Sequence, residues 1–374
     1  MLRRACNWLL LVLPPGWVVT FAFSTWLVIE GLAAFLHWQF PVPGVADPLL
    51  RARDAFAIAA CAALGLYRVA GFHPLFKDAY RRWLSFTPWR RGLPLPVGPV
   101  HLAPQDAAVL AVILVLLHDA QLPRSALPAA FLLTYLIGLL VSFARLGYSR
   151  AAYVLTFALG LAIRLGLITP PGLALLALLV VASQFVLSRT LDDFPWRGRL
   201  SLDAMRDPEH QKRLAVLSVG WPFLQLRPNG LEFGIRYRHG ILLSLLGGWW
   251  TYCLCGLISN AEAREAIEQS LLYFLPLLIV FRRLRVYLSN HRSPIGLLGR
   301  LLTLRWIIPS YDQVFAAPLC ILLTLLFAPA AIDSWSVRLG VPLPTPHLVI
   351  TLALLEALNL GPTVKCWHLT SACR

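Results

Sequence analysis

The stretch "SALPAAFLLTYLIGLLVSFA", residues 125–144, decides the class of fold for this chain. It contains no charged side chain, and its length is close to the ~20 apolar residues that cross a bilayer as a helix. Because unpaired backbone N–H and C=O groups are costly in lipid, such a run must be helical. The whole chain agrees, since 58% of its residues are hydrophobic, 14% are charged and its mean hydropathy is +0.68. These values indicate a membrane protein.

Similar apolar runs occur on both sides of this stretch. We therefore predict an all-α polytopic transmembrane helix bundle of about ten spans. The predicted spans lie near residues 17–38, 54–71, 107–122, 125–144, 151–169, 172–189, 241–258, 269–282, 315–331 and 347–361.

The basic residues are distributed unevenly over the loops between these spans. With the amino terminus inside, most of the 33 Lys and Arg residues fall in alternate loops, as the positive-inside rule requires. Arginine greatly outnumbers lysine, which hints at a GC-rich bacterial genome. We therefore expect a multi-pass protein of the bacterial inner (cytoplasmic) membrane with both termini cytoplasmic. The net charge of +15 then reflects topology, and a nucleic-acid partner need not be invoked. The outer loops hold only Arg51, Arg53, Arg124, Arg264 and Arg338.

The spans form two groups separated by a long polar segment. Residues 1–188 form a first helical half of about six spans, with an interfacial loop over 72–105 on the inner side. Residues 189–240 form a cytoplasmic loop. Residues 241–374 form a second half of about four spans, with an inner-side loop over 283–314 and a cytoplasmic tail. The inner-side segments 72–105, 189–240 and 283–314 are the expected docking surface for a soluble cytoplasmic partner.

The loop over 72–105 mixes aromatic and basic residues. Within it, "FKDAYRRWLSF" predicts an interfacial helix, and the prolines that follow favour an extended path. Aromatic rings with guanidinium groups suit the headgroup layer, where arginine reaches phosphate. The residues expected to contact headgroups or phosphate are Arg81, Arg82, Arg90 and Arg91, interleaved with Trp83, Phe86 and Trp89.

Two aspartates open apolar runs on the inner side. Asp106 follows Pro104, and Asp312 follows Pro309, each after a basic and aromatic stretch. Such a carboxylate can cap the free N–H groups at a helix start, and it can also contact an ion or a substrate. The likeness of 72–122 to 283–331 has two interpretations. It is a true internal repeat, or inner-side helix starts converge on proline plus aspartate.

The polar segment 189–240 has a readable local pattern. "DPEHQKRLAVL", from Asp207, predicts a short helix. Apolar residues then alternate with polar ones from Leu231 to Arg238 after a Pro-Asn-Gly turn at 228–230, which predicts a β-hairpin. Because an isolated hairpin is only marginally stable in water, it should lean on a membrane face or a partner.

Motifs for catalysis or metal binding are lacking in the sequence. There is no phosphate-binding glycine loop, paired-histidine motif or Gly-x-Ser-x-Gly elbow. The tail "CWHLTSACR" brings Cys366, His368 and Cys373 close in sequence, but the irregular spacing does not match a zinc motif. We therefore expect no metal and no cofactor.

Ionisable residues inside predicted spans are better indicators of function, because they are costly in hydrocarbon. They are Glu30, Arg164 and Glu356. Counted from the ends of the predicted spans at ~1.5 Å per residue, Glu30 and Arg164 lie at one depth and Glu356 lies near it. We expect Glu30 and Arg164 to face each other. The set is a structural ion pair, an arginine that reaches outward to the interface, or a path for substrate or protons.

Three functions fit these features. We favour the permease-like membrane subunit of a transport system that works with a soluble ATPase docked on the inner-side loops. One alternative is a membrane-embedded enzyme that acts on a lipid-linked or phosphorylated substrate. The other is a non-catalytic membrane scaffold.

Overall fold

In the computed structural model, every regular element of the described chain is a helix. The structure describes residues 12–39, 47–87, 89, 93, 95–117, 122–194, 196, 237–258, 260–288, 297–304 and 316–360. The chain divides into two compact units, residues 1–199 and 200–374, and each is described here by itself.

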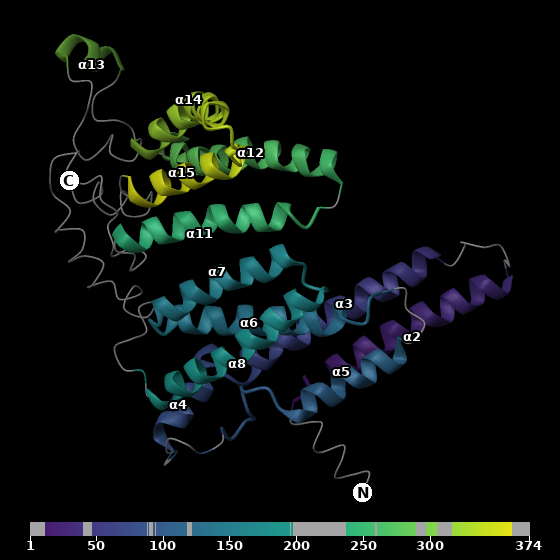
Figure 1. Cartoon of the computed structure of the whole chain (residues 1–374). Helices are drawn as coiled ribbons and strands as arrows, with labels where there is room; N and C mark the ends of the chain where they lie inside the picture. Colours follow the sequence, from purple (N-terminus) through teal and green to yellow (C-terminus); the bar gives the residue numbers. More distant parts are fainter. Residues whose placement is uncertain are drawn as a thin grey trace, which may run out of the picture. The chain divides into compact units, whose positions relative to one another are not determined.

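The first unit is organised around two long helices that lie side by side, α3 (Asp47–Phe72) and α6 (Ala126–Arg145) (Figure 1). Two further helices, α7 and α8, pack against α6 and against each other, while α2 packs on α3. The remaining elements of this unit are α2 (Gly16–Gln39), the 3-10 turn η1 (Pro74–Phe76), α4 (Asp78–Phe86), α5 (Pro104–Leu116), α7 (Ser149–Leu165) and α8 (Pro170–Asp192).

Small residues allow α3 and α6 to approach closely. Gly65 of α3 faces the backbone of Phe131 and the side chain of Thr134 in α6, with no room for a Cβ atom. The Thr134 hydroxyl donates to the carbonyl of Ala62 at 2.7 Å, a bond between the two helices. Close backbone approach and hydroxyl bonding are typical of helix packing in membranes, where lipid provides no hydrophobic drive.

Local sequence explains how α7 begins and ends. Gly147 adopts a φ of 81° in the tight turn between α6 and α7, and Gly166 adopts a φ of 88° where α7 stops. L side chains avoid this left-handed region, so glycine is favoured at both turns. The next helix starts with Pro170 in its first turn, after Thr169, whose hydroxyl accepts the N–H of Gly172 at 3.4 Å.

The second unit packs α15 (Thr345–Asn359) against three other helices (Figure 1). Val280 of α12, Ile321 of α14 and Ala353 of α15 form its buried apolar core. On the other side, Gly248 of α11 contacts Thr351 so closely that a Cβ atom would overlap the threonine hydroxyl. The bounds are α11 (Tyr237–Cys255), α12 (Ala261–Leu288), α13 (Leu297–Thr303) and α14 (Ala316–Leu339).

Five of the described helices are long and apolar enough to cross a membrane: α2, α3, α6, α8 and α14. Their lipid-compatible surface is evident in α2, where Trp17, Val28 and Trp38 are exposed. Contiguous exposed apolar surface of this kind is unusual in soluble proteins. The helices therefore indicate membrane insertion.

The prediction of an all-α protein is confirmed for the described residues, but the count of about ten spans is not supported. Each predicted run falls on a described helix, but α5 ends at Leu116, well before the predicted end at 122. It is thus a short helix of 13 residues. The predicted span at 269–282 belongs to the longer α12, whose apolar stretch is flanked by Glu268 and Arg282. Hydropathy identified apolar runs correctly, but hydrogen bonding and flanking charge set the real helix lengths.

The predicted helix and hairpin of 189–240 lie almost entirely outside the described residues. The exceptions at the carboxyl end are Tyr237 and Arg238, which the alternating pattern assigned to a strand. They form the first turn of α11 instead. Continuation of a long apolar helix toward its amino end outweighs a local alternation of so few residues.

The α3–α6 contact predicts a sharp effect of one methyl group. Gly65→Ala should destabilise the protein by about 1–3 kcal/mol, because overpacking forces the two backbones apart. Gly31→Ala in α2 is the matched control, since a Cβ atom there meets nothing within 4 Å. The general gain of helix propensity from Gly to Ala applies to both variants and cancels. Thermal unfolding of the purified full chain in detergent measures the difference, and equal midpoints for the two variants would contradict the packing.

Candidate functional site

A buried ion pair joins the end of α3 to the start of α5. The Arg68 side chain is 1% exposed, and its Nε lies 2.7 Å from Oδ1 of Asp106. The other carboxylate oxygen of Asp106 accepts the N–H of Ala103 at 2.8 Å, and the Asp106 N–H donates to the Ala103 carbonyl at 2.9 Å. Asp106 is thus the third residue of α5, where its carboxylate bonds to the backbone at the helix start, and Arg68 is its charged partner.

Arg68 makes two further contacts that fix its guanidinium group. Its Nη2 donates to the carbonyl of His101 at 2.9 Å, and the guanidinium lies 4.8 Å from the ring centre of Phe72. Its Nη1 has no hydrogen-bond partner among the described residues. The N–H groups on this buried nitrogen are therefore left for a water molecule or a polar ligand to bond.

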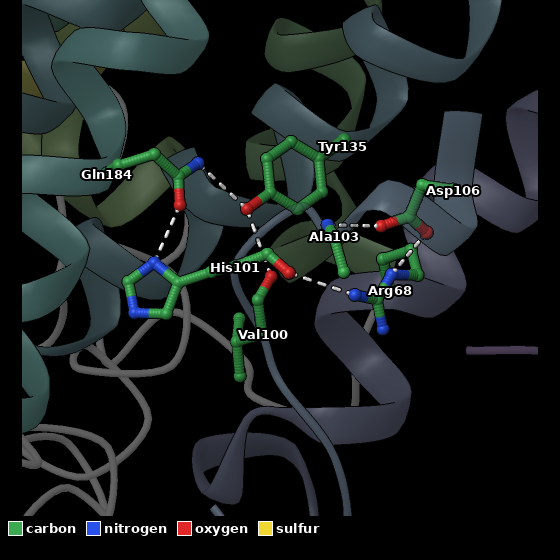
Figure 2. A network of polar contacts seen from close by, with 7 residues as sticks. All are labelled: Arg68, Val100, His101, Ala103, Asp106, Tyr135 and Gln184. Carbon is green, nitrogen blue, oxygen red and sulfur yellow. Dashed lines mark hydrogen bonds and ion pairs between the residues drawn. The ribbon is translucent and has the colours of Figure 1, made fainter. Parts of the chain in front are cut away.

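A second chain of hydrogen bonds lies beside the ion pair, as Figure 2 shows. The ring Nδ1 of His101 lies 2.7 Å from Oε1 of Gln184, and Nε2 of Gln184 donates to the Tyr135 hydroxyl at 3.1 Å. The Tyr135 hydroxyl in turn donates to the carbonyl of Val100 at 3.0 Å. Since an amide oxygen only accepts, the neutral His101 ring carries its proton on Nδ1.

Together these contacts hold the non-helical segment Leu95–Ala103, which turns at residues 96–97, against three helices. Arg68 of α3 bonds to His101, Tyr135 of α6 bonds to Val100, and Gln184 of α8 bonds to the His101 ring. Figure 2 shows the carbonyls of Val100 and His101 turned toward those side chains. The segment cannot form a ladder of its own, so side chains satisfy its carbonyls.

The sequence pointed to Asp106 but not to its partners. In the sequence, Arg68 is one of many inner-side basic residues, and His101 belongs to no recognisable motif. Tyr135 and Gln184 sit in apolar runs and gave no signal by themselves. The sequence pattern could have predicted this pair, because an arginine at a helix end and an aspartate that opens the next apolar run can neutralise each other.

The predicted pairing of Glu30 with Arg164 is wrong. Glu30 is bonded to Nη1 of Arg53 at 2.9 Å, and Arg53 also contacts Asp54 at 3.1 Å. Helix α3 begins at Asp47, so Arg53 lies inside it and next to α2, and not in an outer loop. Arg164 lies in the last turn of α7 with an exposed side chain, because Gly166 ends that helix earlier than hydropathy implied.

Glu356 lies half-buried in α15 of the second unit. The Thr324 hydroxyl of α14 donates to its Oε1 at 2.6 Å, while its Oε2 has no hydrogen-bond partner among the described residues. The contact bridges two helices of the same apolar core. Glu356 therefore has a structural partner that the sequence did not indicate.

The predicted headgroup contacts are described in part. The segment Asp78–Phe86 is a helix, α4, as predicted. Arg81 pairs with Asp78 at 3.0 Å, and Arg82 is exposed beside Trp83, which is 51% exposed. The remaining candidates of this set and the second capping aspartate lie outside the described residues: Arg90, Arg91 and Asp312. The same holds for Cys366, His368 and Cys373.

A buried aromatic group lies between α3 and α4. His73 follows α3, accepts the N–H of Leu75 through Nδ1 at 3.1 Å and stacks on Trp196, with ring centres 5.5 Å apart. Complete burial without a charged partner lowers the pKa of His73 to about 3. The ring is therefore neutral at physiological pH, and it serves to cap η1.

Taken together, the fold and the buried polar network define a helical protein whose apolar helices indicate membrane insertion. No protein-family model, curated protein or solved structure matches the chain. The functional interpretation therefore rests on the residues themselves.

The Arg68–Asp106 pair predicts a strongly non-additive response to mutation. Arg68→Gln or Asp106→Asn alone should destabilise the protein by about 3–5 kcal/mol, because each leaves one buried charge without its partner. The double variant should cost clearly less than the sum of the two. Unfolding of the full chain in detergent provides the four values needed.

The Arg81–Asp78 pair, which is far more exposed than the Arg68–Asp106 pair, is the control for this cycle. Its partners differ by three positions on one helix, and the Asp78 side chain is 68% exposed. Arg81→Gln should cost only about 0–1 kcal/mol, since water replaces the lost contact. Strict additivity at Arg68 and Asp106, or a loss no larger than at Arg81, would show that the buried pair does not act as a unit.

Proposed function

We propose that the chain is the permease-like membrane subunit of a transport system in the bacterial inner membrane. The supporting observation is the region from Leu95 to Leu116. There a non-helical segment, held by side-chain hydrogen bonds from α3 and α6, leads into the short helix α5. The proposal includes about ten spans, in which the shorter apolar helices complete the five long ones.

Membrane physics links such a segment to transport. Backbone outside regular helix must be satisfied by protein or water wherever it borders the apolar layer, and side chains of three helices bond to the inner-side segment Leu95–Ala103. Transporters place substrate and ion sites at helices interrupted in this way, because the free helix ends present polar backbone groups. Here the interruption also carries a buried ion pair and an unused donor, Nη1 of Arg68. Gln105, next to Asp106, adds an unpartnered carbonyl oxygen among the described residues.

The proposed partners are the lipid bilayer and a soluble cytoplasmic ATPase. Helix α4, within the docking segment 72–105, supports a surface of this kind because it exposes both charge and aromatic area. Arg82 is exposed, and Phe86 is 88% exposed. The same proposal assigns the segments 189–240 and 283–314 to the docking surface. No nucleic-acid partner is proposed.

A membrane enzyme for a lipid-linked or phosphorylated substrate is the second candidate. The observation that favours it is the same exposed Arg82 beside Trp83 on α4, since arginine next to an interfacial aromatic ring suits a phosphate headgroup. Pairing of Arg81 with Asp78 reduces the positive charge available for phosphate. Transport is therefore the stronger proposal.

The two functions differ in what happens when the chain is missing. Cells lacking the chain are compared with the same cells re-expressing it, by untargeted mass spectrometry of cytoplasmic, periplasmic and lipid fractions. A transport subunit should change the distribution of one compound between fractions without changing its structure. An enzyme should instead leave a chemically distinct precursor and remove its product. Unchanged compounds in all three fractions would contradict both and favour a scaffold.

The proposed orientation has both termini cytoplasmic and the segments 37–52, 259–268 and 332–346 on the outer side. Cysteines introduced at the exposed positions Glu265 and Ser334 should react with an impermeant maleimide in intact cells. A cysteine at Ser85 on α4 should react only after the membrane is permeabilised. The parent chain, with its seven native cysteines, sets the background. Protection of Glu265→Cys in intact cells together with labelling of Ser85→Cys would overturn this orientation.

A further inference from the structure

Three side chains of metal-ligand type converge in the second unit. Cys255 ends α11, Glu268 lies in α12 and His347 lies in the first turn of α15. One ligand atom of each lies within 4.8 Å of the others. Cys255 and His347 are buried, at 2% and 4% exposure, and Glu268 is half-buried. The helices that carry them pack on one another in this unit.

The contacts of His347 orient its ring toward the other two groups. Its Nε2 lies 3.5 Å from Oε1 of Glu268, and its Nδ1 lies 3.3 Å from the hydroxyl of Thr251. That hydroxyl donates its own proton to the carbonyl of Gly248 at 2.7 Å, so it is free to accept from His347. The neutral ring therefore carries its proton on Nδ1 and turns the lone pair of Nε2 toward the carboxylate.

This arrangement needs a positive charge between the two groups. A lone pair on Nε2 and a carboxylate oxygen repel each other at 3.5 Å unless a cation or a proton lies between them. A proton on Nε2 would remove this repulsion, but it would not explain why the buried thiol of Cys255 lies beside the same two groups. A metal ion accounts for all three groups, since histidine, carboxylate and cysteine are the usual ligands of zinc.

We propose that Cys255, Glu268 and His347 form a binding site for a divalent transition metal ion of the zinc type. Zinc bonds to sulfur, nitrogen and oxygen measure about 2.0–2.3 Å, so tetrahedral ligand atoms lie about 3.3–3.8 Å apart. The Nε2 to Oε1 distance of 3.5 Å already has this value. Three protein ligands leave a fourth position for water or another ligand.

Charge balance favours the ion in this half-buried place. Binding releases the thiol proton of Cys255 to solvent and forms a metal–thiolate bond. The dipositive ion then meets one thiolate, one carboxylate and one neutral imidazole, and the cluster carries no net charge. A neutral cluster avoids the large cost of placing an unbalanced ion away from water.

Two neighbours tune the site. The Thr251 hydroxyl bonds to Nδ1 of His347 and so fixes the orientation of the ring, as hydrogen-bond partners of zinc-binding histidines do. Arg264 lies 3.7 Å from Oε1 of Glu268 with a 46% exposed side chain, and its charge opposes a cation there. Its removal should therefore strengthen binding.

No local motif indicates this site, because its ligands lie far apart along the chain and come from three helices. The prediction that no metal binds rested on local spacing, such as the tail with Cys366 and His368. Helix packing brings together residues that no such motif connects.

The test uses the purified full chain in detergent, freed of metal with a chelator. Zinc affinity is measured by competition with a chromophoric chelator, and cobalt(II) serves as a spectroscopic probe. We expect one zinc ion per chain, together with thiolate-to-cobalt charge-transfer absorption and the visible bands of a tetrahedral cobalt site. Absence of thiolate-to-cobalt absorption in the unmodified chain would overturn the proposal.

Cys253 provides a matched control on the same helix, since it is also fully buried but does not belong to the cluster. Cys255→Ser and His347→Gln should each weaken zinc binding by more than about 100-fold. This loss is larger than the one caused by changing a residue that only holds a ligand in place. Cys253→Ser should retain both the affinity and the cobalt spectrum. Removal of the tail thiols by Cys366→Ser and Cys373→Ser should also leave them unchanged, and loss in either control would overturn the assignment.

Two milder variants keep the test decisive if a ligand variant does not fold. Thr251→Val should weaken zinc binding by about 10–100-fold while the helical circular dichroism stays unchanged. Arg264→Gln should tighten binding, because it removes an opposing charge. Unchanged affinity in both variants, with folded protein, would show that zinc binds elsewhere.

Discussion

In the first unit, buried charges need partners of opposite charge and buried backbone groups need hydrogen bonds, because burial removes them from water. The main example is the ion pair of Arg68 and Asp106, which joins the end of α3 to the first turn of α5. Through the carbonyl of His101, the same arginine also holds the non-helical segment that precedes α5. Without these contacts the segment would leave polar groups unsatisfied among apolar helices, which is the costly condition in lipid.

Close helix contact supplies the second constraint, and both units use it. Gly65 lets α3 meet α6, and Gly248 lets α11 meet α15. In each case a threonine on the facing helix lies at the contact, Thr134 in the first unit and Thr351 in the second. Hydrocarbon gives apolar side chains no reason to prefer protein over lipid, so backbone proximity and hydroxyl bonding hold such helices together.

The two proposals draw on polar groups that this packing gathers. In the first unit, the proposal of transport rests on the non-helical segment Leu95–Ala103, on the short helix α5 and on Nη1 of Arg68, which has no hydrogen-bond partner among the described residues. In the second unit, helices α11, α12 and α15 bring a thiol, a carboxylate and an imidazole within reach of one ion. The metal site rests on residues of the second unit alone, so it does not depend on the buried polar network that supports transport. A zinc site would stabilise the second unit whether the chain transports a solute or acts on a lipid.

The sequence by itself determined the helical class and the position of the apolar runs, and it singled out Asp106 at a helix start. These are local properties, set by composition, periodicity and the dipole of a single helix. Helix lengths and partners were decided only by tertiary structure. Glu30 meets Arg53 and not Arg164, because the start of α3 and the end of α7 depend on packing and turns. Likewise Cys255, Glu268 and His347 are distant in the chain, so only the packing of three helices makes them neighbours.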